Sequence, residues 1–238
     1  MNSNKVDILA FGAHPDDVEC AAAGVLVKHI AMGKSVAIID LTSGEMGSFG
    51  NVETRKNEAK IASEILGLKS REMLGLPDGG IENNEAARML VIELIRKYQP
   101  DIVLCNALHD RHPDHANAAK LIADACFLSG LKKKETFFNE ELQEPWRPAC
   151  IYHYIQDYLL QPDFVIDITQ QMDKKMESIK AYKSQFVDAN DHNPNSVLAF
   201  LDQINNMNSI YGRPLNVKYA EGFNVSRYLG VADFYQLI

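Results

Sequence analysis

The order of apolar runs and helical segments in the first half of the chain restricts its fold more than any other feature. Four short strand-like runs alternate with four segments whose apolar residues recur at helical spacing. We expect strands at 6–12, 35–41, 72–74 and 101–106, and helices at 18–32, 53–66, 84–98 and 116–128. Such an alternation predicts an α/β fold in which a mostly parallel sheet carries helices on both faces.

The second half of the chain has a less regular pattern. We expect strands at 151–155 and 164–168, and helices at 172–184 and 196–207. Neither an internal repeat nor a low-complexity stretch separates the two halves. The sequence therefore predicts a single domain over 1–238, with 1–130 as its regular core and 131–238 as a less regular C-terminal cap.

Charge and composition exclude several classes of function. The formal net charge of -8 disfavours binding to nucleic acid, and the basic run 132–134 leads directly into an acidic stretch. No apolar stretch approaches the ~20 residues that a membrane span needs, and no signal peptide precedes the first strand. The four cysteines lack a CxxC spacing. We therefore expect a cytoplasmic protein with reduced thiols that binds neither nucleic acid nor membrane.

Two polar segments follow strands that are expected to be neighbours. AHPDDVE (13–19) comes directly after the first strand, and HPDH (112–115) comes after the fourth, each at the start of a helix. In the common doubly wound strand order these two strands flank the point where the order reverses, and ligands bind outside their carboxyl ends. The two segments are therefore expected to form one crevice.

The side chains in this crevice suit a catalytic metal ion. His14 and Asp17 can reach one point from the start of a helix, and His115 can supply a third ligand from the other segment. Two imidazoles, one carboxylate and an open position are typical of catalytic zinc. Bound zinc lowers the pKa of its water from ~15.7 towards ~7 and polarises a carbonyl group. Iron or cobalt would also fit these donors.

Three further residues can take part in catalysis at such a site. Asp16 can act as general base and then protonate a leaving amine. His112 can stabilise an oxyanion, with Asp114 setting its tautomer or charge. A simple helix N-cap is the alternative interpretation of either segment alone, because Asp favours that position. The occurrence of both segments at matching strand ends favours the metal site.

AHPDDVE and HPDH together resemble the paired signature of the LmbE-like, or PIG-L-like, N-acetylglucosamine deacetylases. Other segments are similar to the bacillithiol-biosynthesis branch of that family: LTSGEMGSFG (41–50), TRKNEAKIASEILG (54–67), LGLPDGGI (74–81), DRHPDH (110–115) and YAEGF (219–223). The resemblance covers essentially the whole chain. It implies a Rossmann-like fold and one zinc ion held by His14, Asp17 and His115. It also implies Asp16 as base, His112 on the oxyanion side and Asp114 as its support.

The resemblance further implies a hydrolase of linear amides that removes the N-acetyl group from an N-acetylglucosamine conjugate, first of all N-acetylglucosaminyl malate. It implies two substrate-binding arginines, Arg55 and Arg111, because an arginine fork suits the carboxylates of malate. A helix-face position is the alternative for Arg55, and a surface ion pair with Asp110 or Asp114 is the alternative for Arg111. A homo-oligomer, with a hexamer among the expected forms, is also implied.

Several alternatives to this function stay open. Cys20 and Ala21 stand where many family members carry an aliphatic residue and a glycine, and residues 106–109 are also unusual. These departures leave the ligand positions intact but weaken any assignment of the aglycone. An amidase acting on a thiol S-conjugate and a deacetylase of another N-acetylglucosaminide are the alternatives within the enzyme class. A non-catalytic sugar- or nucleotide-binding module is the alternative outside it, although GAHPDD replaces the glycine-rich phosphate loop.

Overall fold

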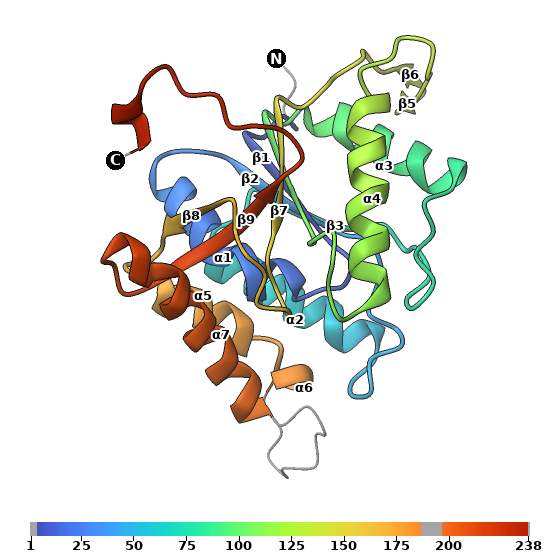
Figure 1. Ribbon diagram of the computed structural model, residues 1–238. Helices are drawn as coiled ribbons and strands as arrows, with labels where there is room; N and C mark the ends of the chain where they lie inside the picture. The colour runs from blue at the N-terminus through green and yellow to red at the C-terminus, as the bar shows by residue number, and fades with distance from the viewer. Residues whose placement is uncertain (1–3, 187–196, 238) are drawn as a thin grey trace.

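A seven-stranded sheet in the order β3-β2-β1-β4-β7-β9-β8 crosses the centre of the molecule (Figure 1). The computed structural model describes residues 4–186 and 197–237. Five neighbouring strands are parallel: β3 (Ser70–Met73), β2 (Val36–Asp40), β1 (Ile8–Gly12), β4 (Ile102–Cys105) and β7 (Cys150–Tyr154). The strand β9 (Ala220–Val225) runs antiparallel to both of its neighbours, β7 and β8 (Phe164–Asp167).

Helices cover both faces of the sheet, as the sequence predicted. One face carries α1 (Asp17–Ala31), α2 (Val52–Leu66), α5 (Met172–Lys180) and α7 (Val197–Gly212). The other face carries α3 (Glu85–Tyr98) and α4 (Pro113–Leu128). The short elements are α6 (Lys183–Phe186), η1 (Arg213–Leu215), η2 (Phe234–Leu237) and the hairpin of β5 (Phe137–Phe138) and β6 (Glu141–Leu142). Among the described residues, no helix is both long and apolar enough to cross a membrane.

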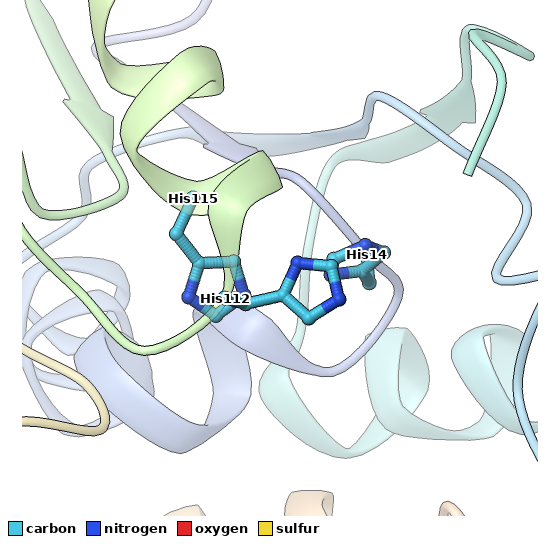
Figure 2. A group of neighbouring side chains, drawn as sticks. All are labelled: His14, His112 and His115. Atoms are coloured by element: carbon cyan, nitrogen blue, oxygen red, sulfur yellow. The ribbon is translucent and has the colours of Figure 1, made fainter. Parts of the chain in front are cut away.

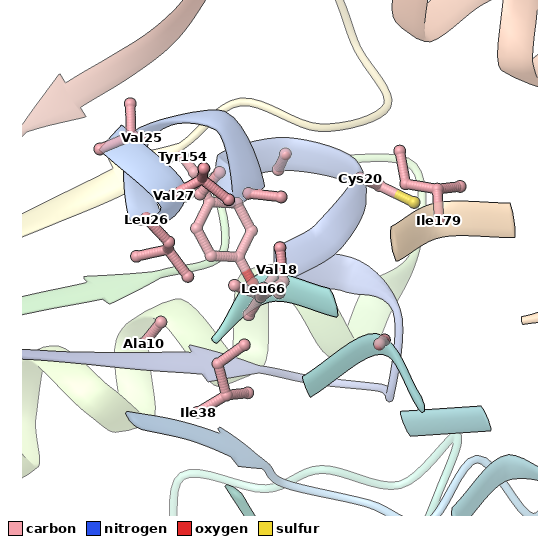
Figure 3. Close-up of a cluster of buried hydrophobic side chains, with 14 of the residues drawn as sticks. Ala10, Val18, Cys20, Val25, Leu26, Val27, Ile38, Leu66, Tyr154 and Ile179 are labelled. Atoms are coloured by element: carbon pink, nitrogen blue, oxygen red, sulfur yellow. The ribbon is translucent and has the colours of Figure 1, made fainter. Parts of the chain in front are cut away.

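The central strand β1 contributes alternate side chains to two separate cores. Ile8 and Ala10 pack with α1, α2 and α5, whereas Leu9 and Phe11 pack with α3 and α4. This follows from the strand geometry, in which successive side chains point to opposite faces. All five residues of β1 are buried because helices cover both faces. Figure 3 shows the first core, where α1 packs over the sheet near Tyr154.

The predicted elements of the first half are confirmed, with shifts of a few residues at their ends. The prediction that the first and fourth strands are neighbours is also confirmed, since Ile8 of β1 pairs with Ile102 of β4. The helix expected at 172–184 is interrupted: α5 ends at Lys180, and the buried Tyr182 separates it from α6. The helix expected at 196–207 extends to Gly212, while residue 196 lies outside the described residues.

The strand β9 was not predicted, because its sequence lacks the pattern of a buried strand. AEGFNV contains a glycine and a charged residue, Glu221, that is only 1% exposed. Its burial is compensated by contacts from distant parts of the chain, including the buried Lys175. The hairpin of β5 and β6 was also not predicted, because each of its strands has only two residues.

Candidate metal and catalytic site

The loops after β1 and β4 bring the two polar segments together at the carboxyl ends of these strands. His14 lies in the loop that leads from β1 into α1, and His112 is the N-cap of α4, which begins at Pro113. Proline suits the first position of a helix because its φ is already helical. Figure 2 shows the rings of His14, His112 and His115 facing one another. The centroids of the His14 and His112 rings are 4.6 Å apart.

Asp17 lies between the two histidines with which it was predicted to bind metal. Its Oδ2 is 3.6 Å from Nδ1 of His14, and its Oδ1 is 3.3 Å from Nε2 of His115. Ligand atoms of His14, His112 and His115 also lie within 4.8 Å of one another. The structure therefore brings the three predicted ligands together and places His112 beside them.

The other ring nitrogen of His14 faces two carboxylates. Nε2 of His14 lies 3.0 Å from Oδ1 of Asp78 and 3.2 Å from Oδ2 of Asp114. Burial by itself disfavours the charged imidazole, but hydrogen bonds to Asp17 and Asp78 outweigh it and raise the pKa of His14 to about 11. The carboxylates around this ring therefore strongly favour positive charge.

His115 has the same arrangement at its second nitrogen. Nδ1 of His115 lies 2.7 Å from Oδ2 of Asp110. Burial disfavours its charged form as well, but Asp17 and Asp110 raise the pKa of His115 to about 10. A carboxylate on the second nitrogen of each histidine is the usual environment of metal-binding histidines, where it fixes the tautomer. The donor set therefore fits a divalent transition-metal ion.

The carboxylate of Asp17 is held in place by several donors. Oδ2 accepts hydrogen bonds from the backbone N–H of His14 at 2.9 Å and from Nδ2 of Asn106 at 3.0 Å. Oδ1 accepts from Nε2 of Gln156 at 2.8 Å. Burial would raise the pKa of Asp17, but the charges of His115 and His14 outweigh it and hold the pKa well below its usual value. Asp17 is therefore ionised and oriented for a cation.

Asn106 and Gln156 were not predicted as site residues. Asn106 directly follows β4, and its Oδ1 also accepts from the backbone N–H of Ala13 at 3.0 Å, so the amide joins both loops. Its position at a strand end was the signal that could have identified it. Gln156 follows β7, and only the order of strands in the sheet brings it to Asp17.

Asp16, the predicted base, has an unusual backbone conformation. Its φ is 122° and its ψ is -22°, which is rare for any residue other than glycine. Such strain typically costs about 1–3 kcal/mol and is found mostly at functional sites. Burial raises the pKa of Asp16 to about 7, although the charge of Arg55 opposes this shift. A carboxyl group that titrates near neutral pH is suited to accept and donate protons.

The carboxylate of Asp114 does not contact the ring of His112 in the way that was expected. Its oxygens face His14 and accept from the backbone N–H groups of Gly79 at 2.8 Å and Ile81 at 3.2 Å. The backbone N–H of Asp114 instead donates to Nδ1 of His112 at 3.2 Å. Neutral His112 therefore carries its proton on Nε2. Burial and the charges of His14 and His115 lower the pKa of His112.

The residues of the site line a cavity of about 760 Å³, and the two predicted substrate-binding arginines line it as well. Arg55 is 4% exposed, its Nη2 donates to the carbonyl of Pro15, and Nη2 lies 3.2 Å from Oδ2 of Asp16. Arg111 has a side chain that is 60% exposed, and its Nε lies 2.8 Å from Oδ2 of Asp157. Its ion pair is therefore with Asp157, which the sequence had not indicated.

Known proteins are similar to this chain in sequence and in structure. A family model described as PIG-L, GlcNAc-PI de-N-acetylase, matches residues 9–126, which include both polar segments. A diacetylchitobiose deacetylase from Thermococcus kodakarensis is 28% identical over 226 residues, which are 90% of this chain and 81% of the relative. A probable N-acetyl-alpha-D-glucosaminyl L-malate deacetylase 2 from Bacillus anthracis is 25% identical over 197 residues, 77% of this chain and 83% of the relative.

The fold agrees with that of a solved structure. A conserved protein from Thermus thermophilus, known from a crystal structure, has 34% sequence identity to this chain. The two structures superpose with a TM-score of 0.85. The match covers 95% of this chain and 98% of the other. The likeness therefore extends beyond the range of the family model into the C-terminal half.

Proposed function

Because the chain belongs to the PIG-L/LmbE-like family of deacetylases, which are amide hydrolases, we propose that it removes the N-acetyl group from an N-acetylglucosamine conjugate, first of all N-acetylglucosaminyl malate. The observation that carries this proposal is the environment of Asp16. Its buried carboxyl group has a pKa raised to about 7 and adjoins Asp17, which lies between two histidines in the lining of the cavity.

We further propose zinc as the metal, held by His14, Asp17 and His115. The contacts of Asp17 with both rings support this set, and the carboxylates on the second ring nitrogens support it further. When bound, zinc would supply an acidified water molecule and polarise the acetyl carbonyl.

The side chains of the protein then move the proton and stabilise charge. Asp16 takes a proton from the attacking water and returns it to the sugar nitrogen as the amide bond breaks. Burial raises the pKa of this carboxyl group, which favours its holding the proton until it passes to the nitrogen. His112, which carries its proton on Nε2 when neutral, donates a hydrogen bond to the oxygen that becomes negative. Throughout these steps, the side-chain amides of Asn106 and Gln156 hold the Asp17 carboxylate in its orientation by donating hydrogen bonds to it.

The surroundings of Arg55 and Arg111 help to identify the aglycone, the part of the substrate that is attached to the sugar. Arg111 lines the cavity and its side chain is 60% exposed, so its guanidinium group is accessible to a malate carboxylate. A second candidate substrate is an N-acetylglucosaminide without a carboxylate. It is favoured by the acidic partners that both Arg55 and Arg111 already have. The similarity to a diacetylchitobiose deacetylase also supports this candidate.

The proposal is tested by measuring amine release from N-acetylglucosaminyl malate by the zinc-loaded protein. We expect Asp16→Asn to lower kcat by about 10²- to 10⁴-fold, because general acid–base catalysis is lost. Zinc content, measured on the same samples, should stay unchanged. Full activity in this variant would refute Asp16 as base. N,N'-diacetylchitobiose and a thiol S-conjugate are assayed in parallel, and turnover of one of these alone would reject malate as the aglycone.

A further inference from the structure

Residues 42–50, the loop between β2 and α2, form part of the wall of the cavity. Gly44, Met46 and Phe49 are among its lining residues. The beginning of this cavity loop is held at Thr42, whose Oγ1 donates to the carbonyl of Ala13 at 2.9 Å. Its end is held where Nε2 of Gln185 donates to the carbonyl of Phe49 at 3.0 Å. The middle of the loop depends on a different set of contacts.

Asp78 makes these contacts, and it joins the middle of the cavity loop to His14. Oδ2 of Asp78 accepts from the backbone N–H of Met46 at 2.8 Å, while Oδ1 lies 3.0 Å from Nε2 of His14. The backbone N–H of Asp78 donates to Oε1 of Glu45 at 2.9 Å, and Oε2 of Glu45 accepts from the N–H of Ser43 at 3.2 Å. The side chain of Asp78 is only 7% exposed.

We propose that Asp78 is a positioning residue that couples the cavity loop to His14, so that binding of zinc and binding of the sugar strengthen each other. The inference rests on the proposed function for the identity of both ligands. A carboxylate on Nε2–H makes Nδ1 a stronger metal ligand and fixes the ring. The same carboxylate holds Met46 at the cavity wall. A change in the position of the Met46 amide therefore changes the hydrogen bond between Asp78 and the imidazole, and the coupling is reciprocal.

Asp114 also faces Nε2 of His14, but its environment is different. Its two oxygens accept from the amide groups of Gly79 and Ile81. Asp114 therefore anchors the ring to the segment after Asp78, whereas Asp78 connects the ring to residues that line the cavity. This difference makes Asp78 the residue through which the loop and the metal site interact.

Replacement by asparagine tests this role with little change in shape. An amide has one acceptor oxygen, so Asp78→Asn can accept from Met46 or from His14 but not from both. We expect zinc affinity, measured by competition with a chromogenic chelator, to fall about 10- to 100-fold. In the wild type, saturating glucosamine should tighten zinc binding. In Asp78→Asn this effect of glucosamine should be lost.

Glu45→Gln is the matched control, because it weakens another contact of the loop while the Asp78 carboxylate keeps its contacts with Met46 and His14. The glutamine has one acceptor oxygen, so it loses one of the two hydrogen bonds that Glu45 accepts from the backbone N–H groups of Asp78 and Ser43. We expect the affinity for glucosamine to fall. Zinc affinity measured without glucosamine should stay within about twofold of the wild type. Unchanged zinc affinity in Asp78→Asn would overturn the inference. An equal loss of zinc affinity in Glu45→Gln would do the same. Wild-type zinc affinity that ignores glucosamine would overturn the coupling, whereas failure of amine release would overturn only the proposed reaction.

Discussion

At the scale of single residues, two adjacent aspartates of the AHPDD segment differ because of their surroundings. Asp17 accepts from three donors and lies between two histidines, which keep its pKa well below the usual value. Asp16 is buried beside Arg55, and burial raises its pKa to about 7. The sequence predicted a role for each of them, but the amide side chains that hold Asp17 come from residues about 90 and 140 positions away.

Removal of the amide of Gln156 should weaken metal binding. In Gln156→Leu, Oδ1 of Asp17 loses a donor at 2.8 Å, so we expect zinc affinity to fall about 10- to 100-fold. Gln143→Leu is the matched control, since its Nε2 donates to the carbonyl of Glu93 at 3.0 Å, far from the site. Zinc affinity is measured by chelator competition. An equal loss in both variants would point to a general effect on the fold.

At the scale of elements, the helix that carries Asp17 is fixed in its middle by the strand β9. Oε1 and Oε2 of Glu221 accept from the backbone N–H groups of Gly24 and Val25 at 2.9 and 2.7 Å. Nζ of Lys175 in α5 lies 2.8 Å from Oε1 of Glu221 and also donates to Oδ1 of Asn208 at 3.1 Å. The buried carboxylate and Lys175 thus join α1, α5, α7 and β9, which explains how a strand with a buried charge is accommodated.

Breaking this pair from one side should strongly destabilise the protein. In Lys175→Met the carboxylate of Glu221 stays buried without its countercharge, which typically costs about 3–5 kcal/mol. Lys174→Met, on the exposed side of the same helix, should change stability by less than about 0.5 kcal/mol. Urea unfolding measures both values. In the double variant Lys175→Met, Glu221→Gln, the unpaired negative charge is removed, so part of the lost stability should return. If the double variant were no more stable than Lys175→Met alone, an unpaired buried charge would not be the cause of the destabilisation.

At the scale of the whole molecule, the sequence predicted the parallel half of the sheet better than its antiparallel edge. The runs at 6–12 and 101–106 are apolar because β1 and β4 are covered on both faces, and their adjacency followed from the common strand order. The prediction that His14, Asp17 and His115 lie together followed from the pairing of these two strands. The strand β9 and Asp78 could not be predicted, because their partners are fixed only by the three-dimensional structure.

The pH dependence of global stability should include a contribution from Asp7, at the start of the sheet. Hydrogen bonds from the backbone and hydroxyl of Ser35, with help from Lys34, lower the pKa of Asp7 to about 2. A lowered pKa in the folded state stabilises the protein above the unfolded value near 3.8, and this contribution is lost as the pH falls towards 2. Because the side chain is 32% exposed, we expect a contribution of about 1 kcal/mol.

Asp7→Asn should therefore be less stable than the wild type at pH 6, and the difference should shrink at pH 3. Urea unfolding at the two pH values measures the change in the free energy of unfolding. A difference of the same size at both pH values would mean that the hydrogen bonds matter but the charge of Asp7 does not.

The position of β9 also has a consequence for the time at which the protein becomes active in the cell. This strand follows β8 in the sequence by more than 50 residues, yet it lies between β7 and β8. A nascent chain therefore exposes an unpaired edge of β7 until residues 220–225 have left the ribosome. Glu221 arrives with them, and only then can its carboxylate accept from the amides in the middle of α1. We expect the emergence of residues 220–225, rather than that of the histidines, to set the moment at which the site is complete.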